Sequence, residues 1–186
     1  MNIGFAMCGS FCTYEQVFPA MEKLAETHNL IPIFSEASYT TDSRFGTHRM
    51  HILTAERICG HEVLHTIEQV EPIGPKKLLD ALIIAPCTGN TLAKLAHSIA
   101  DGPVTMAAKS HLRNSRPVIV AVSTNDALAG AAENIGRLLN RKNYYFVPFG
   151  QDSPEKKPTS MVADFFKIPE TLTAALEYQQ IQPILL

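Results

Sequence analysis

Two short turns in this chain place small hydroxyl and amide side chains in positions suited to binding an anion. The first, Gly9-Ser10, follows the apolar residues 2–7. The second follows the apolar run 81–85 and consists of Thr88, Gly89, Asn90 and Thr91. Each turn precedes a helix-like pattern, and a helix N-terminus directs N–H groups and a positive dipole end at a phosphate. An ordinary strand–helix connection with a helix cap is the alternative.

Two further polar loops are predicted to reach the same place. The loop 35–48, which begins with Ser35, follows a strand predicted at 30–35. Ser123 and Asn125 follow a strand predicted at 118–122. Because parallel strands end at one edge of a sheet, we expect these loops and both turns to line one site. Loop 35–48 is either a lid or substrate loop, or a solvated surface loop. The basic side chains in this loop and directly after it, Arg44, His48 and Arg49, are suited to a substrate carboxylate.

His61 and His65 match the spacing H-E-x-x-H, which on a helix supplies two zinc ligands and a general base. Gly60 is expected to end the helix predicted over residues 47–59. The β-branched residues within 63–70 favour a strand, in which the two histidines would lie about 13 Å apart. We therefore predict no metal site and disfavour a zinc hydrolase.

The four cysteines, Cys8, Cys12, Cys59 and Cys87, form no C-x-x-C pair and are interpreted as reduced thiols. Cys87 precedes the second turn, where a helix N-terminus lowers a thiol pKa. It is either a reactive thiol lining the site or a small buried filler of the core.

Composition limits the classes of function. The chain has 186 residues, of which 46% are hydrophobic and 18% charged, as expected of a globular domain. Its net charge of −2 gives no indication of nucleic acid or of an anionic membrane surface as partner. No apolar run is long enough to cross a membrane, and the first residues do not resemble a signal peptide. We expect a cytoplasmic protein.

Strand-like and helix-like segments alternate along the chain, which predicts an α/β fold with a doubly wound, mostly parallel sheet. Thr13 and Gln16 are spaced as a capping box for the first helix. The last strand is expected at 144–147, followed by an arm at 150–168 and a closing helix at 169–180, all within one domain, 1–186. The apolar tail 181–186 suggests contact with a neighbour in a homo-oligomer.

The sequence A-P-C-T-G-N-T-L-A-K-L-A-H-S-I-A-D at 85–101 resembles the A-P-A-S-A-N-T signature of the family of flavin-containing cysteine decarboxylases and their relatives. The resemblance implies a Rossmann-like fold, helices on both faces of the sheet, a homo-oligomer and an FMN site between subunits. It assigns nucleotide contacts to the positions Gly9, Ser10, Ser35, Thr88, Asn90, Thr91 and Ser123.

A second stretch, F-V-P-F-G-Q-D-S-P-E-K-K-P at 146–158, resembles a narrower group of relatives. That resemblance implies an oxidoreductase subunit that acts on a small dicarboxylate together with a partner subunit that holds NADP. The absence of G-x-G-x-x-G from this chain agrees with a dinucleotide site on the partner.

Two departures separate the chain from the decarboxylases. The decarboxylases carry a histidine eight residues before the aspartate that matches Asp80. In this chain that position is Pro72, whose side chain cannot donate or accept a proton. Of their motif P-x-M-N-x-x-M-W, at 122–129 here, only Asn125 remains, and we count it among the cofactor-binding candidates. A flavin-dependent decarboxylase, or a protein that only binds flavin, is therefore the alternative to the oxidoreductase subunit.

Overall fold

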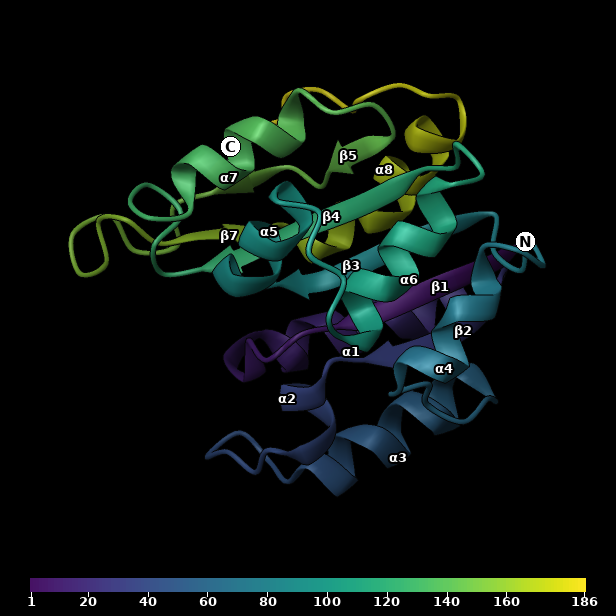
Figure 1. The fold of residues 1–186 in the computed structure, drawn as a ribbon. Coiled ribbons are helices and arrows are strands. Elements are labelled where there is room, and N and C mark those ends of the chain that lie inside the picture. The colour runs from purple at the N-terminus through teal and green to yellow at the C-terminus, as the bar shows by residue number, and fades with distance from the viewer.

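A computed structural model describes all 186 residues and has a seven-stranded sheet at its centre (Figure 1). The strands are β1 (Asn2–Met7), β2 (Asn29–Phe34), β3 (Ala81–Cys87), β4 (Val118–Thr124), β5 (Tyr144–Phe146), β6 (Phe149–Gly150) and β7 (Met161–Ala163). Their order is β2-β1-β3-β4-β7-β6, with β5 also paired to β4. Strands β1 to β5 are parallel, and β6 and β7 are antiparallel additions. The predicted α/β class with a mostly parallel sheet is confirmed.

Helices cover both faces of the sheet. They are α1 (Tyr14–Ala25), α2 (Glu36–Thr40), α3 (His48–Cys59), α4 (Ile67–Val70), α5 (Gly89–Ala96), α6 (Pro103–Leu112), α7 (Ala132–Leu139) and α8 (Ile168–Leu176). Short 3-10 turns lie at Phe11–Thr13, Glu71–Ile73 and Phe165–Lys167. Helices α1 and α8 lie on one face, and α5, α6 and α7 on the other (Figure 1). None of the helices combines the length and apolar composition needed to span a bilayer.

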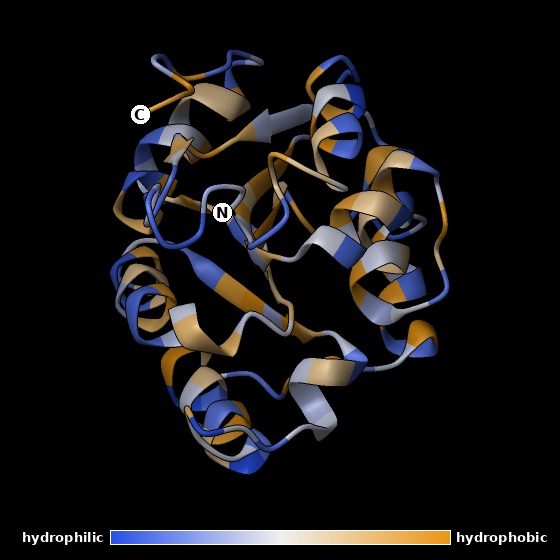
Figure 2. Cartoon of the chain, turned by 90° about the vertical axis from the view of Figure 1, so that its left-hand side faces the viewer, coloured by the Kyte–Doolittle hydropathy of each residue, from blue (hydrophilic) through white to orange (hydrophobic).

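The central strands form the core because both of their faces are covered. All seven residues of β3 are buried, and Leu82, Ile83 and Ile84 have no exposed surface. Burying each of these side chains contributes about 1.5–3 kcal/mol. Figure 2, seen from the side of the carboxyl strand ends, shows helices with both hydrophilic and hydrophobic residues on the two sides of the sheet. The turns that follow β1 and β3 are thereby held on a rigid support.

The structure corrects the predicted start of the first helix. The chain enters α1 through the 3-10 turn Phe11–Thr13, so Thr13 already has a helical backbone. Its hydroxyl donates back to the carbonyl of Ser10 at 2.9 Å and caps no N–H group. The predicted Thr13–Gln16 capping box is therefore wrong.

The strand expected within 63–70 is also wrong. Thr66 and Gln69 form a capping box in which Thr66 Oγ1 accepts from the Gln69 N–H and Gln69 Oε1 accepts from the Thr66 N–H. This local hydrogen bonding begins α4 and outweighs the weak strand preference of the β-branched residues. Only Leu64 makes a strand-like bridge, to Ile33.

Three predicted boundaries are displaced. Strand β3 continues through Pro86 to Cys87, because its pairing with β4 is irregular there and the missing N–H is not needed. Helix α5, expected to include Ile99 and Ala100, ends at Ala96, since Ser98 adopts a left-handed backbone conformation with φ of 59°; Ile99 is exposed. The loop 35–48 contains the short helix α2, capped by Ser35.

The segment after β5 is more regular than expected. Strand β5 is not the last one, since β6 at the start of the predicted arm and β7 within it form an antiparallel pair. The closing helix begins slightly earlier than predicted and ends at Leu176. The apolar tail pairs within the same chain, where Phe149 N donates to Ile184 O at 3.0 Å and Leu186 N donates to Phe149 O at 3.1 Å. The side chains of Leu185 and Leu186 stay exposed.

Candidate functional site

Two adjoining cavities lie at the carboxyl edge of the sheet. The large cavity, of about 980 Å³, is bordered by the turn after β1, the end of β4 and the arm. The small cavity, of about 410 Å³, is bordered by the N-terminal ends of α2, α5 and α6. Gly9, Thr88 and Asn90 line both cavities and form the wall between them. The predicted convergence of the two turns on one site is therefore present in the fold.

The eight predicted site residues divide between the cavities. Those lining the large cavity are Gly9, Ser10, Thr88, Asn90, Ser123 and Asn125. Those lining the small cavity are Gly9, Ser35, Thr88, Asn90 and Thr91. Of the three basic residues proposed for loop 35–48, Arg44 lines the large cavity. His48 pairs instead with Asp42 at 2.7 Å, and Arg49 lies on the outer surface of α3.

Hydroxyl groups at helix N-termini dominate the small cavity. Thr88 caps α5, accepting from the Thr91 N–H at 3.3 Å, and its hydroxyl lies 3.1 Å from the Thr91 hydroxyl. Ser35 caps α2 in the same way. Thr105 contributes another hydroxyl from the start of α6. The cavity thus has many neutral donors and two helices of at least eight residues directed at it, which suits an anion.

One cation lies at this cavity and is already paired. Lys94 Nζ is 2.9 Å from Asp101 Oδ1, and hydrogen bonding by Lys94 lowers the pKa of Asp101. Both side chains are partly exposed, so the pair contributes little to folding stability.

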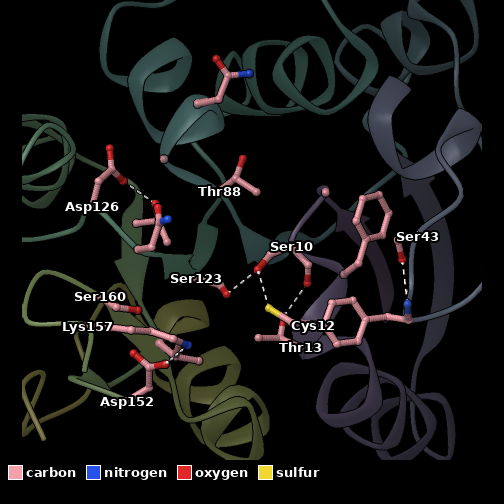
Figure 3. Close-up of a pocket in the computed structure, with 18 of the residues that line it drawn as sticks. Ser10, Cys12, Thr13, Ser43, Thr88, Ser123, Asp126, Asp152, Lys157 and Ser160 are labelled. Carbon is pink, nitrogen blue, oxygen red and sulfur yellow. Dashed lines mark hydrogen bonds and ion pairs between the residues drawn. The ribbon is translucent and has the colours of Figure 1, made fainter. Parts of the chain in front are cut away.

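Ser10 links the two sides of the large cavity. Its hydroxyl lies 2.8 Å from that of Ser123 and 3.8 Å from the sulfur of Cys12 (Figure 3). The turn after β1 is thereby joined to the end of β4. Since either serine can donate to the other, one of the two hydroxyl hydrogens stays free for a ligand.

Asp126 lines the large cavity beside Ser123 and Asn125 but was not among the predicted cofactor-binding residues. Thr124 donates a short hydrogen bond to Asp126 Oδ1 (Figure 3). A Cβ at Gly89 would lie 2.7 Å from Asp126 Oδ1 and 2.8 Å from Thr124 Oγ1. A side chain at position 89 would therefore displace Asp126 or Thr124 from the start of α5. The pair N-D directly after Ser123-Thr124 was the available signal.

The arm supplies the second group of missed residues, Asp152, Lys157 and Ser160, which line the large cavity. Lys157 Nζ is 3.2 Å from Asp152 Oδ2. Partial burial opposes ionisation of Asp152, but hydrogen bonds from Ser160 and Lys157 outweigh it and lower the pKa of Asp152. The K-K pair at 156–157 was visible in the sequence, but nothing indicated that the arm folds back over the site.

The thiols differ in their surroundings. Cys87 is fully buried, and burial raises its pKa well above the usual value. Burial also raises the pKa of Cys8 to about 11. The expected activation of Cys87 by the helix N-terminus is overcome by desolvation, so the structure supports the alternative of a buried filler. Cys12 is the exposed cysteine, and it lines the large cavity.

The two histidines of the H-E-x-x-H match have separate partners. His61 Nε2 lies 2.7 Å from Asn29 Oδ1, and the His65 ring stacks on Tyr39 with ring centroids 3.6 Å apart. Gly60, with φ of 67°, ends α3 as predicted, so the two histidines do not share a helix.

Comparison with known proteins assigns the chain to a family. The family model described as Flavoprotein matches residues 1–176. The dipicolinate synthase B-subunit of Bacillus subtilis (strain 168) is 47% identical over 185 residues, covering 99% of this chain and 92% of the relative.

Solved structures of relatives agree with this family assignment. That of the dipicolinate synthase B-subunit from Bacillus halodurans C matches with a TM-score of 0.91 and 45% identity, covering 100% of this chain and 95% of the other. The FMN-dependent cysteine decarboxylase SpaF shares the fold, with a TM-score of 0.70 and 21% identity, covering 96% of this chain and 97% of the other. The chain therefore belongs to the flavoprotein family.

Proposed function

We propose that this chain is one of the two subunits of a dipicolinate synthase, which oxidises dihydrodipicolinate to dipicolinate in spore formation. The proposal rests on the 47% sequence identity to the B-subunit of dipicolinate synthase, which extends over 99% of this chain. The oxidation removes a hydride and a proton from the substrate. The nicotinamide of NADP⁺, held by the A-subunit of the synthase, receives the hydride in this proposal. The chain would act in the cytoplasm as one flavoprotein-like domain with an arm.

We further propose that the small cavity holds the phosphate of FMN. The donors there fit a phosphate monoester, namely the hydroxyls of Ser35, Thr88 and Thr91 and the amide of Asn90. The flavin ring would extend past Gly9 into the large cavity, beside Ser10, Ser123 and Asn125. FMN, when bound, supplies a two-electron acceptor at this edge of the sheet.

In this arrangement the chain's own residues bind and orient. Ser10 and Ser123 would position the ring, Asn125 would donate its amide to the ligand, and the arm would limit water access to the large cavity. A Cβ at Gly9 would lie 3.3 Å from that of Ala37, so this glycine lets the turn after β1 pack closely against α2.

A mixed assay tests the synthase proposal. Freshly prepared dihydrodipicolinate and NADP⁺ are incubated with this chain, with its proposed partner (the A-subunit), and with both, and dipicolinate is quantified. We expect rapid formation only in the mixture. Equal rates from the partner alone would contradict a role for this chain. A visible absorption spectrum of the purified chain with added FMN tests flavin binding separately.

An FMN-dependent decarboxylase is the second candidate, favoured by the shared fold with SpaF. Pro72, at the position of the decarboxylase histidine, lies in the 3-10 turn Glu71–Ile73 and offers no titratable group. Incubation with peptides ending in cysteine, followed by mass spectrometry for loss of carbon dioxide, decides between the two.

We also propose a homo-oligomer. Phe45, Met50, Leu53, Leu185 and Leu186 are large apolar side chains that stay exposed. Light scattering at micromolar concentration should give a mass that is a multiple of 20.4 kDa. A monomer would contradict this proposal.

A further inference from the structure

The distinctive sequence at 146–158 forms part of the wall of the large cavity. Strand β7 pairs antiparallel with the end of β4, with Ser123 opposite Val162. Next to this pairing, Thr159 Oγ1 donates to the Asn125 carbonyl at 2.7 Å, and Leu128 N donates to the Thr159 carbonyl at 3.0 Å. The arm is therefore fixed directly to the loop that contains the predicted site residues Ser123 and Asn125.

Within the arm, the backbone of Lys157 is held on both sides. Lys157 N donates to the Ser153 carbonyl at 2.7 Å, and Ser160 N donates to the Lys157 carbonyl at 3.0 Å. Gln151 Nε2 donates to the Pro158 carbonyl at 2.8 Å and closes the turn. The lysine side chain thus starts from a defined place on the cavity wall.

The ammonium group of Lys157 keeps donors available. Its Nζ lies 3.2 Å from Asp152 Oδ2, and an ammonium has three N–H donors, of which this contact uses one. The Asp152 side chain is 28% exposed and that of Lys157 is 59% exposed, so the carboxylate is the more buried partner. Asp152 therefore acts as an anchor that directs the ammonium along the wall, where Figure 3 shows it on the side opposite Ser43.

Few cations border this cavity. Lys157 and Arg44 are the only ones among its lining residues, and the Arg44 guanidinium lies 4.8 Å from the centre of the Phe45 ring on the opposite loop. The neighbouring Lys156 does not line the cavity. A ligand with two carboxylates therefore meets one anchored cation on the arm side.

We propose that Lys157 is a specificity-determining residue that binds one carboxylate of a dicarboxylate ligand in the large cavity, with Asp152 as its positioning residue. The inference rests on the proposed function for the identity of the ligand. It also gives a role to the sequence Q-D-S-P-E-K-K-P, whose aspartate and second lysine become the anchor and the carboxylate-binding group.

Calorimetry on the full chain supplied with FMN tests the inference. The probes are dipicolinate, with two carboxylates, and picolinate, which has the same ring and one carboxylate. The variants are Lys157→Gln, Lys157→Arg and the matched control Lys156→Gln. For Lys157→Gln we expect dipicolinate affinity to fall about five- to tenfold, the effect of one partly exposed charged hydrogen bond. Picolinate affinity should change less than dipicolinate affinity in this variant.

Lys157→Arg should retain most of the wild-type preference, and Lys156→Gln should behave as wild type. Equal losses in the Lys156 and Lys157 variants would overturn the inference, because they would indicate only a general attraction by the arm. Unchanged dipicolinate affinity in Lys157→Gln would overturn it too.

The two proposals fail differently. If the mixed assay yields no dipicolinate but dipicolinate binding depends on Lys157, the synthase proposal fails and the carboxylate site stands. If the mixture is active and Lys157→Gln leaves the KM for dihydrodipicolinate unchanged, the inference about Lys157 fails and the proposed function stands.

Discussion

Replacing Gly89 with alanine tests the close contact between the start of α5 and Asp126. The new Cβ would lie 2.7 Å from Asp126 Oδ1 and 2.8 Å from Thr124 Oγ1, which is too close for either atom to stay in place. The Asp126 carboxylate must rotate away and lose its hydrogen bond from Thr124. A hydrogen bond to a charged group contributes about 1.5–3 kcal/mol, and partial exposure of Asp126 reduces this to about 1–2 kcal/mol.

Alanine also stabilises a helix relative to glycine, which works in the opposite direction. The gain is about 1 kcal/mol in a helix interior and about half of that at the first helical residue, where Gly89 lies. We therefore expect Gly89→Ala to lower the free energy of unfolding by about 1 kcal/mol. Urea titration at constant m-value measures this change.

Gly136→Ala is the matched control. Gly136 lies in the interior of α7, also eight residues long, and a Cβ there would meet nothing within 4 Å. This variant should gain about 0.5–1 kcal/mol from helix propensity. If both variants stabilise the protein equally, the contact between Gly89 and Asp126 has no energetic consequence and the reasoning is refuted.

Three further predictions concern the cavities and the core. Asn90→Leu should weaken FMN or phosphate binding by about 1.5–3 kcal/mol with a smaller change in folding stability, and calorimetry showing equal affinity in both proteins would contradict the proposed anion site. Cys87→Ser should retain synthase activity in the mixed assay. A thiol reagent should modify Cys12 in the folded protein and Cys87 only after unfolding. Modification of Cys87 in the folded protein would contradict its burial. Burial lowers the pKa of His111 to about 4, against 6.5 in the unfolded chain, so below pH 6.5 only the unfolded state gains a proton there. Stability should then fall by about 2 kcal/mol between pH 7.5 and 5, and His111→Gln, measured by urea titration at both values, should lose this part of the pH dependence.

Sequence patterns predicted the parts of the fold whose cause is local or strongly repetitive. The continuous apolar run of β3 and the helix stop at Gly60 are of this kind. The stretch 63–70 was misassigned because β-branched residues express only a weak preference, whereas the Thr66–Gln69 capping box is a specific set of hydrogen bonds. Strands β6 and β7 escaped prediction because two or three residues contain no period, and β7 joins the sheet by pairing with β4, which lies far away in the chain.

The candidate site divides in the same way. Ser10, Thr88 and Asn90 were predictable because each follows a recognisable strand, and strand ends meet at one edge. Lys157 was not, since its place in the large cavity depends on the return of the arm over the loop after β4, and the contact of Asp126 with the start of α5 is likewise long-range. The pairs N-D and K-K were visible in the sequence, but the long-range contacts that bring these side chains to the cavity were not.

The wall shared by the two cavities has a thermodynamic consequence. Gly9, Thr88 and Asn90 face both spaces, so a ligand that shifts these residues from one side changes the shape offered to the other. Binding in the small cavity and binding in the large cavity are then linked, and this linkage is reciprocal. If an anion in the small cavity raises the affinity of the large cavity for its ligand, that ligand raises the affinity of the small cavity for the anion by the same factor. If the proposed FMN binds, its loss during purification would accordingly slow when the second ligand is kept in the buffer.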